Sequence, residues 1–497
     1  RITYMEKQKK TPFYSKLKEY SSEDIVPFDV PGHKRGILET DLKLDVGPDI
    51  YKLDSNAPRG LDNLNHPKGV IKESEKLAAL AFQADEAFFL TGGTTSGILA
   101  MMMLAVKAKQ KIIMPRNVHK SIINGLILSG GIPVFIKPDM DNDLGIANGV
   151  SFEKYKNAID DNEDAVAILV INPTYFGVVN DLDKIISYAH EKEMLVLADE
   201  AHGGNLYFSS ELPKGAIHSG ADISAVSMHK SLGSLTQSSI LLTKGNKVDL
   251  RKLRSTLNIV QSTSPSQLLI ASIDVARKTM FFEGHKLDGV VHIVDETINK
   301  INEIPGLKAV GKDYFIKKGA FDYDPTRLII DFSRLGMTGF EAYRVLADDY
   351  KIQMELAESK IVLAVMSIGT TKEHLEKLLS ALKDLSNKRY NSSIKTESKV
   401  IFVYPESYTR PREAYHAPYK IIKIEDSLNE IAAGSIMAYP PGIPLVIPGE
   451  IITREIIDAL IEYKNNDQTI LSDTEEGYIK VIDKDEWIKW EGFNDEI

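Results

Sequence analysis

The stretch Ala221-Asp222-Ile223-Ser224-Ala225-Val226, followed by Ser227-Met228-His229-Lys230, predicts a buried strand that places a lysine at the edge of a sheet. A polar segment comes next, and then a second apolar run at residues 239–243. A lysine amine at a strand end can form a Schiff base with a carbonyl group, while Ser227 and His229 can donate hydrogen bonds to a phosphate. Taken alone, a solvated loop lysine is the simpler interpretation. Three further stretches favour the chemical one.

Short apolar runs alternate with helix-like segments along the middle of the chain. The runs lie at residues 112–114, 134–136, 165–171, 194–198 and 223–226. This alternation predicts an α/β domain with a mostly parallel sheet, in which a ligand binds beyond the carboxyl ends of the strands. Side chains suited to binding or catalysis follow several of the predicted strands: Thr91, His119, Asn172, Asp199 and Lys230. We therefore expect one site at one edge of the sheet.

Residues 87–97 combine a predicted strand, a glycine turn and a cluster of hydroxyl side chains. A helix is predicted before them, from about Val70 to Phe82, and the apolar run at 98–106 predicts a buried helix after them. Free amides at the start of that helix, together with the hydroxyls, would form an anion site suited to a phosphate. The segment lacks both the lysine of a P-loop and the spacing of a dinucleotide fingerprint. On its own, it is equally explained by a turn and a helix cap.

Asp199 and His119 add two groups that a ring-shaped cofactor would need. Asp199 ends the apolar run 195–198, where a carboxylate is costly unless a cation or hydrogen-bond donors pair with it. A protonated pyridine nitrogen would be such a partner, and the planar ring of His119 could stack on an aromatic ring. Separately, Asp199 could cap the next segment and His119 could be a satisfied core histidine. Together with Lys230 and the anion site, they supply what pyridoxal 5'-phosphate requires.

The composition of the 497-residue chain argues against several other classes of function. Its formal net charge of −10 disfavours a nucleic-acid binder, which would present a basic surface. The chain contains no cysteine, so it can form neither a disulfide framework nor a thiolate metal site, and we predict no metal. No apolar run reaches the length of a membrane span, and we expect a cytoplasmic protein.

We expect four segments along the chain. They are an N-terminal segment (1–35), a large cofactor-binding domain (36–280), a small α/β domain (281–390) and a C-terminal domain (391–497). The C-terminal domain carries a proline-rich stretch, Ala438-Tyr439-Pro440-Pro441-Gly442-Ile443-Pro444-Leu445-Val446-Ile447-Pro448-Gly449-Glu450. Because proline interrupts backbone hydrogen bonding, we expect this stretch to form neither a regular strand nor a helix.

These motifs resemble those of the bacterial ornithine/lysine/arginine decarboxylases, which are fold-type I (aspartate aminotransferase-like) pyridoxal phosphate enzymes. The resemblance runs through nearly the whole chain and rests on residues 31–33, Leu61-Asp62 with His66, 91–95, 116–121, 199–201, 227–230, 439–442 and 448–450. The stretch from Tyr439 to Glu450 is the most family-specific, because pyridoxal phosphate enzymes in general have no counterpart to it. The chain resembles the short form without the N-terminal wing domain. The resemblance implies a large α/β domain with a mostly parallel sheet, a smaller α+β domain and a C-terminal α+β domain.

The resemblance implies which residues contact the cofactor ring. Lys230 would be the Schiff-base lysine, and Asp199 would pair with the pyridinium nitrogen. His119 would stack on the ring, and Ala201 would pack against its opposite face.

A second group of residues would surround the phosphate and the lysine. The implied phosphate ligands are Thr94, Thr95, Ser227 and His229. Gly93 and His202 are also predicted to belong to the cofactor site. The larger enzymes of the family carry asparagine at the position of Gly92 and tryptophan at the position of His202.

The implied reaction is the decarboxylation of a basic amino acid, and our best prediction is L-arginine to agmatine in polyamine biosynthesis. Lysine or ornithine, giving cadaverine or putrescine, is an alternative substrate. Alternative functions are those of another fold-type I enzyme, such as an aminotransferase or an aldolase-like lyase, and of a catalytically silent relative. Either His229 or Lys230 would return a proton to the α-carbon. Predicted substrate contacts are His33, Glu355, Glu358 and Glu450.

The resemblance also implies assembly, because fold-type I sites generally lie between two subunits. Residues 31–33 and the loop-rich stretch through Asp62 and His66 are too irregular to build a core alone. We expect them to pack across a two-fold interface, in a homodimer or higher homo-oligomer with shared active sites.

Overall fold

A computed structural model describes residues 2–390, 403–439, 442–466 and 468–489. The chain divides into two compact units. The first unit comprises residues 1–104, 196–289 and 367–369, and the second comprises 105–195, 290–366 and 370–497. Each unit is described below by itself.

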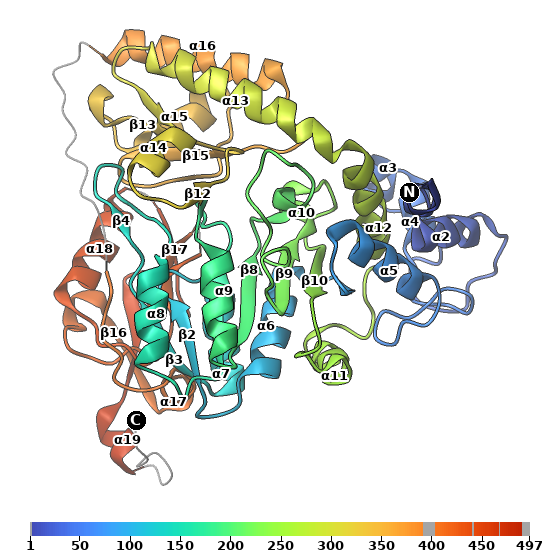
Figure 1. The fold of residues 1–497 in the computed structure, drawn as a ribbon, viewed down its shortest axis with the longest axis horizontal. Coiled ribbons are helices and arrows are strands. Elements are labelled where there is room, and N and C mark those ends of the chain that lie inside the picture. The colour runs from blue at the N-terminus through green and yellow to red at the C-terminus, as the bar shows by residue number, and fades with distance from the viewer. Residues whose placement is uncertain (1, 391–402, 440–441, 467, 490–497) are drawn as a thin grey trace. The chain divides into compact units, whose positions relative to one another are not determined.

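Four strands of the first unit position the predicted lysine and aspartate. They lie side by side in the order β1 (Glu86–Leu90), β10 (Ser239–Thr243), β9 (Ile223–Ser227) and β8 (Leu195–Glu200), of which β8 begins one residue before the unit (Figure 1). Strands β8 and β9 are parallel, whereas β10 runs antiparallel to both of its neighbours. The predicted runs ending at Val226 and Thr243 are therefore confirmed as strands.

Two helices of the first unit, α6 and α5, differ in how their apolar side chains are distributed. Helix α6 (Gly93–Ala105) follows β1 directly and is almost uniformly apolar, as expected for a buried helix. Helix α5 (Val70–Phe82) has one buried face, at the boundaries that the sequence predicts. The unit also contains α1 (Ile2–Gln8), α2 (Pro12–Ser22), α3 (Asp41–Val46), α4 (Pro48–Leu53), η1 (Gly204–Tyr207), α10 (Met228–Ser231), α11 (Leu250–Val260), α12 (Gln267–Glu283) and η2 (Gly284–Lys286).

Two N-terminal helices, α1 and α2, are fixed to α12 by a buried ion pair. The fully buried Arg277 pairs with Asp274 at 2.8 Å and donates to the carbonyl oxygen of Gln8 at 2.7 Å. Asp274 in turn accepts from the backbone amide of Phe13 at 3.1 Å. Buried polar groups are stable only when they are hydrogen-bonded, and here each charge has a partner.

The second unit contains three parallel strands in the order β6 (Ala167–Ile171), β2 (Lys111–Pro115) and β3 (Ile132–Ile136). Their connecting helices are α7 (Lys120–Ser129), α8 (Phe152–Asp160) and α9 (Leu182–Glu191). Parallel pairing joined by helices is the arrangement that the alternating pattern predicts. The predicted α/β class with a mostly parallel sheet is confirmed.

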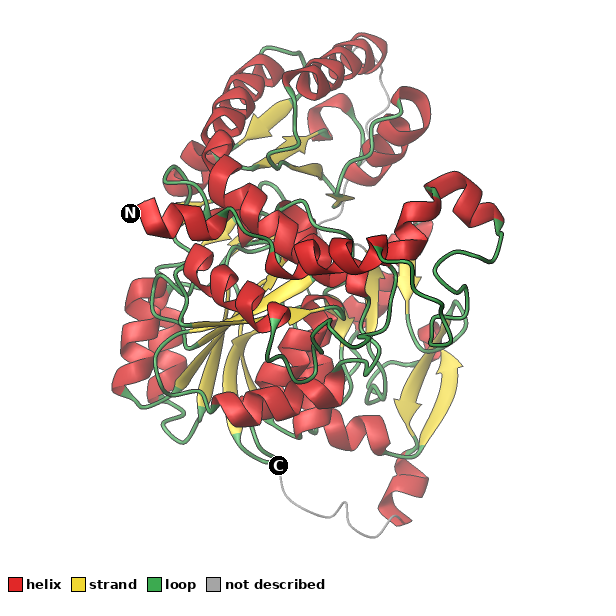
Figure 2. Ribbon diagram, turned by 90° about the vertical axis from the view of Figure 1, so that its right-hand side faces the viewer, coloured by secondary structure: helices red, strands yellow, loops and turns green. Residues whose placement is uncertain are grey.

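A smaller sheet in the second unit has the order β11 (Lys308–Val310), β13 (Arg327–Asp331), β15 (Ile361–Val365) and β14 (Leu356–Ala357). Two long helices, α13 (Leu287–Asn302) and α16 (Lys372–Arg389), lie on the same side of it (Figures 1 and 2). Their apolar side chains form one core with those of β13, β15 and α15 (Gly339–Tyr350). Short elements complete this part: β4 (Met140–Asp141), β5 (Ile146–Ala147), β7 (Val178–Val179), α14 (Lys312–Lys317), β12 (Asp322–Tyr323) and η3 (Ser333–Leu335).

The C-terminal part of the second unit forms two small antiparallel sheets. One pairs β16 (Tyr419–Lys423) with β20 (Tyr478–Ile482), and the other has the order β18 (Pro444–Val446), β17 (Ile436–Tyr439) and β19 (Thr469–Leu471). Helices α17 (Pro411–His416), η4 (Ile424–Asp426), α18 (Arg454–Asn465) and α19 (Lys484–Lys489) complete it.

The expectation that prolines keep residues 438–450 out of regular structure is wrong for part of the stretch. Residues 438–439 end strand β17, and residues 444–446 form β18, which is an edge strand of its sheet. An edge strand tolerates proline because one of its sides makes no ladder hydrogen bonds. Pro440 and Pro441 lie outside the described residues.

Within the described ranges, no helix is both long enough and apolar enough to cross a membrane. The longest of these helices, α16, has 18 residues. Charged side chains recur along it, so its length alone does not make it a membrane span.

Candidate functional site

Lys230 lies immediately beyond strand β9, in a single helical turn. That turn, α10, begins at Met228 directly after Ser227, the last residue of the strand. The side-chain Nζ of Lys230 lies 3.2 Å from Nε2 of His202. His202 follows the neighbouring strand β8, so two adjacent strand ends bring an amine and an imidazole together. This contact has the geometry needed to pass a proton between the two groups.

Asp199 lies near the end of β8, on the strand that runs parallel to β9. Asp199 is opposite Ala225 in the register, and its side chain is buried. One carboxylate oxygen accepts the backbone amide of Ala201 at 3.1 Å. The carboxylate therefore fixes the turn that carries Ala201 and His202, as the capping alternative requires. A second oxygen remains for a ring nitrogen, so the two interpretations are compatible.

The predicted phosphate site is a cluster of hydroxyl groups at the start of α6. The Thr94 hydroxyl is hydrogen-bonded to Ser227, and it also lies 3.0 Å from the hydroxyl of Ser239. Thr95 is exposed at the same helix start. Gly93 has a positive φ of 71°, a conformation that glycine adopts without strain, and its amide donates to Gln237. A 13-residue helix beginning with such hydroxyls is a suitable anion site.

The turn before this helix is crowded on one side. A side chain at Gly92 would approach the Cβ of Ser96 to 3.0 Å and its hydroxyl oxygen to 3.1 Å. Glycine at this position therefore leaves the first turn of α6 open to a ligand.

His229 has a defined tautomer. Its Nδ1 lies 3.0 Å from the carbonyl oxygen of Ser238, and because a carbonyl oxygen only accepts, Nδ1 carries the proton. Burial lowers the pKa of His229 below its ordinary value, which favours the neutral ring at pH 7. In that state Nε2 accepts a hydrogen bond, so a role as a donor to phosphate requires the ring to gain a second proton.

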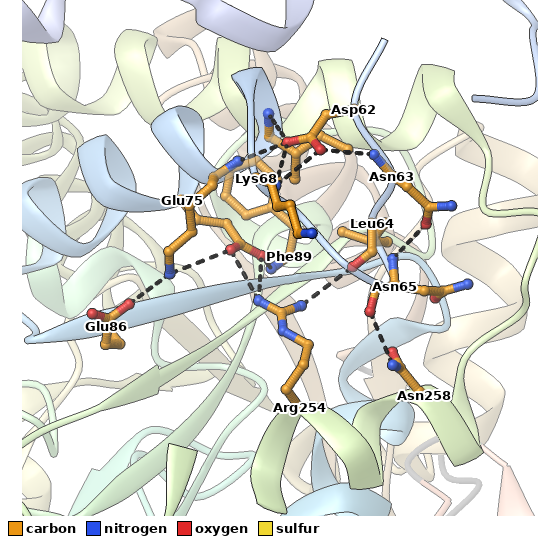
Figure 3. A network of polar contacts seen from close by, with 12 residues as sticks. Asp62, Asn63, Leu64, Asn65, Lys68, Glu75, Glu86, Phe89, Arg254 and Asn258 are labelled. Atoms are coloured by element: carbon orange, nitrogen blue, oxygen red, sulfur yellow. Dashed lines mark hydrogen bonds and ion pairs between the residues drawn. The ribbon is translucent and has the colours of Figure 1, made fainter. Parts of the chain in front are cut away.

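A buried ion pair supports the strand that leads into the phosphate turn. Glu75 pairs with Arg254 at 3.0 Å and accepts the backbone amide of Phe89, in β1, at 3.1 Å (Figure 3). Burial raises the pKa of Glu75, while the positive charges of Arg254 and Lys72 oppose that rise. This network ties α5 and α11 to the strand that ends just before Gly92.

The loop through Asp62 is anchored to the start of α5, the helix that carries Glu75. The Asp62 carboxylate accepts the amides of Gly69 at 2.7 Å and Ile71 at 3.1 Å, so it caps the start of α5. Asp62 therefore stabilises its own loop, whatever it contributes to assembly. His33, predicted to contact substrate, lies 3.0 Å from Asp54 and packs edge-on against Tyr51.

Sequence reasoning missed Glu200, the residue after Asp199. Its carboxylate accepts the Ser224 hydroxyl at 2.6 Å and the Ala216 amide at 2.7 Å, and it also accepts from Tyr207. Burial and the neighbouring carboxylate raise the pKa of Tyr207. Glu200 thus joins β8 to β9 directly beside Asp199. Two consecutive carboxylates at the end of an apolar strand were the signal that could have identified it.

The second unit holds the other predicted residues. His119 is the N-cap of α7, where its Nδ1 accepts the backbone amide of Ser121 at 3.1 Å. Glu355 accepts the Tyr175 hydroxyl at 2.5 Å. Glu358 lies 3.4 Å from the Tyr463 hydroxyl.

Glu450 differs from Glu355 and Glu358 because Arg116 binds both of its carboxylate oxygens. Nε of Arg116 lies 2.7 Å from Oε1, and Nη2 lies 2.8 Å from Oε2. Both side chains are buried. This pairing leaves little for a cationic substrate, so Glu450 is better explained as a structural residue.

Comparison with solved structures defines the class of fold. A lysine decarboxylase of Francisella novicida superposes with a TM-score of 0.81, covering 95% of this chain and 81% of that one, at 20% identity. This likeness shows that the chain shares the fold of that protein over nearly its whole length.

The family follows from the sequence matches. The model of the Orn/Lys/Arg decarboxylase major domain matches residues 11–374, and that of the C-terminal domain matches residues 395–470. An arginine decarboxylase of Bacillus subtilis is 39% identical, covering 93% of this chain and 94% of the relative. One of Halalkalibacterium halodurans is 40% identical, covering 90% and 92%. The chain therefore belongs to the Orn/Lys/Arg decarboxylase family and is a decarboxylase, as the motifs predict.

Proposed function

We propose that the protein decarboxylates L-arginine to agmatine, with pyridoxal 5'-phosphate as its cofactor. The observation that carries the proposal is the position of Lys230, the third residue of the turn that follows β9, the strand beside that of Asp199. The relatives of Bacillus and Halalkalibacterium named arginine decarboxylase support arginine over lysine or ornithine. Assignment to polyamine biosynthesis and to the cytoplasm stays a prediction.

The first unit fits the cofactor by the chemistry of its donor set. Hydroxyls and free amides at the start of α6, with Ser227, would hold the phosphate: Thr94, Thr95 and Ser227. The amide of Gly93 already donates to Gln237, so Gly93 would shape the turn beside the phosphate. Lys230 would form the covalent link, with His202 beside it. By the family resemblance, Ala201 would pack on one face of the ring, and His119, which belongs to the second unit, would stack on the other. When bound, pyridoxal phosphate supplies an electron sink for the bond that breaks at the α-carbon.

The side chains of the protein have three tasks in this proposal. Asp199 keeps a proton on the ring nitrogen, because a buried carboxylate is stabilised by a positive charge beside it. The hydroxyl cluster fixes the phosphate and thereby the orientation of the ring. Lys230, in contact with His202, returns a proton to the α-carbon. His229 is less suited to that step, because its neutral ring has its proton on Nδ1, directed at Ser238.

We also infer a homodimer or a higher homo-oligomer. Apolar side chains are strongly exposed along residues 26–44, where Phe28 is 93% exposed, Leu44 76%, Val26 74% and Ile37 71%. Exposed apolar side chains concentrated in one segment are typical of an interface. A Phe28→Asp, Leu44→Asp variant should sediment as a smaller species than the wild type. Unchanged sedimentation of that variant would contradict an interface at this segment.

The substrate is tested by incubating the purified protein, with added pyridoxal phosphate, separately with arginine, lysine and ornithine. We expect carbon dioxide and agmatine from arginine, identified by mass spectrometry. Cadaverine or putrescine as the main product would reassign the substrate within the family. Formation of a keto acid without carbon dioxide would contradict decarboxylation itself.

A further inference from the structure

A cavity of about 100 Å³ lies entirely among residues of the second unit. Its lining combines charged, amide and aromatic side chains: Arg116, Asn117, Phe176, Glu358, Tyr404 and Tyr463. Its other walls are apolar residues of β5, β18 and their neighbours. The reaction proposed above uses none of the six as a reacting group.

The two charged side chains of the lining are in opposite situations. Arg116 is neutralised, because its guanidinium is bound through two nitrogens to Glu450. Glu358 has no lysine, arginine or histidine within ion-pair distance among the described residues, and its side-chain contact is the 3.4 Å one with the Tyr463 hydroxyl. Burial raises the pKa of Glu358 to about 7. An ionised Glu358 is therefore a negative charge that the surrounding protein does not balance.

A second acceptor in the lining also lacks a partner. The side-chain oxygen of Asn117 is buried and accepts no hydrogen bond within the described part of the chain. The backbone carbonyls of Pro444 and Leu445 already accept from Arg116. Glu358 and Asn117 thus both require a hydrogen-bond donor, and a ligand that supplied N–H groups would satisfy them.

The aromatic walls specify the charge of such a ligand. Phe176, Tyr404 and Tyr463 line the same space, and the faces of aromatic rings attract cations. Planar guanidinium and compact ammonium groups both carry several donors and one positive charge. We propose that this cavity binds the cationic end of a small organic ligand, a guanidinium or a primary ammonium group. The binding test is independent of the arginine decarboxylase assignment, whereas the choice between the sources of the ligand rests on that proposed function.

Two kinds of ligand could carry the cationic group that the cavity would bind. The cavity could receive the distal group of the enzyme's own substrate, or it could hold a separate amine that acts as an effector. Inhibition of agmatine formation by guanidinium distinguishes them. Competition with arginine identifies the substrate's own end, and non-competitive inhibition identifies a separate ligand.

Affinity should depend on pH through Glu358. The charged and titratable groups facing it are Arg116 with its partner Glu450, and the hydroxyls of Tyr404 and Tyr463. Because the pKa of Glu358 is raised to about 7, the carboxylate is ionised above that pH and gains a proton below it. Affinity for a cation is then lost as the pH falls, and we expect it to be about tenfold weaker at pH 6 than at pH 8.

Calorimetric titration of the cofactor-loaded protein with millimolar guanidinium chloride tests the proposal, with urea as the neutral probe of the same shape. Glu358→Gln keeps the shape of the side chain and removes its charge, and should weaken guanidinium binding about tenfold or more. Glu303→Gln, which removes an exposed carboxylate elsewhere in the same unit, is the matched control and should bind like the wild type. Ala147→Leu fills the cavity from β5 without changing any charge, and should also abolish binding.

Each outcome decides the proposal. Binding of guanidinium but not urea, lost in Glu358→Gln and in Ala147→Leu, supports it. Equal affinity in the wild type and Glu358→Gln would overturn it, as would equal binding of urea and guanidinium. If Glu358→Gln failed to fold, unchanged binding in Ala147→Leu would still overturn it.

Discussion

The end of strand β8 and the contact between Arg116 and Glu450 use carboxylate side chains in opposite ways. In the second contact, the Glu450 carboxylate accepts three hydrogen bonds, two from Arg116 and one from the amide of Ile447 at 2.9 Å. At the strand end, one oxygen of Asp199 holds the Ala201 amide and the other is left for a ligand. Polar groups saturated by the protein stabilise the fold, whereas those only partly engaged are available for chemistry. Substitutions should therefore separate stability from activity.

The largest expected effect is that of Lys230→Ala on turnover. No other side chain beyond β9 offers a nucleophilic amine, so we expect a loss of roughly 10⁴-fold or more in kcat. The midpoint of denaturant unfolding should change little, because the side chain is exposed. Borohydride reduction with pyridoxal phosphate, followed by peptide mapping, should label Lys230 in the wild type. A label on another lysine would end the assignment.

Arg116→Ala should have the reverse profile, with a large loss of stability. Removing the guanidinium leaves the buried carboxylate of Glu450 without a counter-charge, and we expect unfolding to become easier by about 3–5 kcal/mol. Urea unfolding measures this, and Lys388→Ala, which breaks an exposed pair with Asp384, is the control and should change stability far less. The double variant Arg116→Met, Glu450→Met should recover most of the loss. Equal stability of Arg116→Ala and Lys388→Ala would show that the hydrogen bonds from Arg116 to Glu450 do not stabilise the fold.

Asp199→Asn should lower activity without releasing the cofactor. An amide cannot hold a proton on a ring nitrogen, so we expect kcat to fall roughly 100-fold, equivalent to about 2.7 kcal/mol. Cofactor content after gel filtration, set beside the rate of agmatine formation, separates the two effects. Near-normal turnover would reduce Asp199 to the capping role that its bond to Ala201 already fills.

The elements that the sequence predicts well are those with local signals. Helix α5 has a regular apolar face, and the strands ending at Val226 and Thr243 are short apolar runs bounded by polar residues. Strand β18 was missed because its proline is compatible with a strand only at a sheet edge. Edge position is set by which strands pair, and residues 436–439 pair both with 444–446, close by in sequence, and with 469–471, which follow α18.

Among the site residues too, some could be predicted from local sequence patterns and others could not. Lys230, Asp199 and the hydroxyls of α6 each follow a predicted strand, so topology alone groups them. The partner of Glu450 lies 334 residues away in sequence, and no local pattern distinguishes a saturated glutamate from an available one. The isolation of Glu358 likewise depends on what surrounds it in three dimensions. Residue type therefore identified candidate carboxylates, while contacts determined which of them remain available.

The smallest predicted difference is between two histidines, His119→Ala and His33→Ala. A ring stacked on the cofactor contributes about 1 kcal/mol, so His119→Ala should weaken cofactor retention roughly fivefold. His33 is occupied by Asp54 and Tyr51, and its loss should leave retention unchanged. Both variants remove an imidazole, which makes them matched controls for each other. Cofactor absorbance during dialysis measures the difference.

His119 also caps α7, so the unfolding of both variants must be recorded. A His119→Asn variant restores a capping side chain without the ring. If His119→Asn retains the cofactor as well as the wild type does, the contribution of His119 is the cap and not the ring.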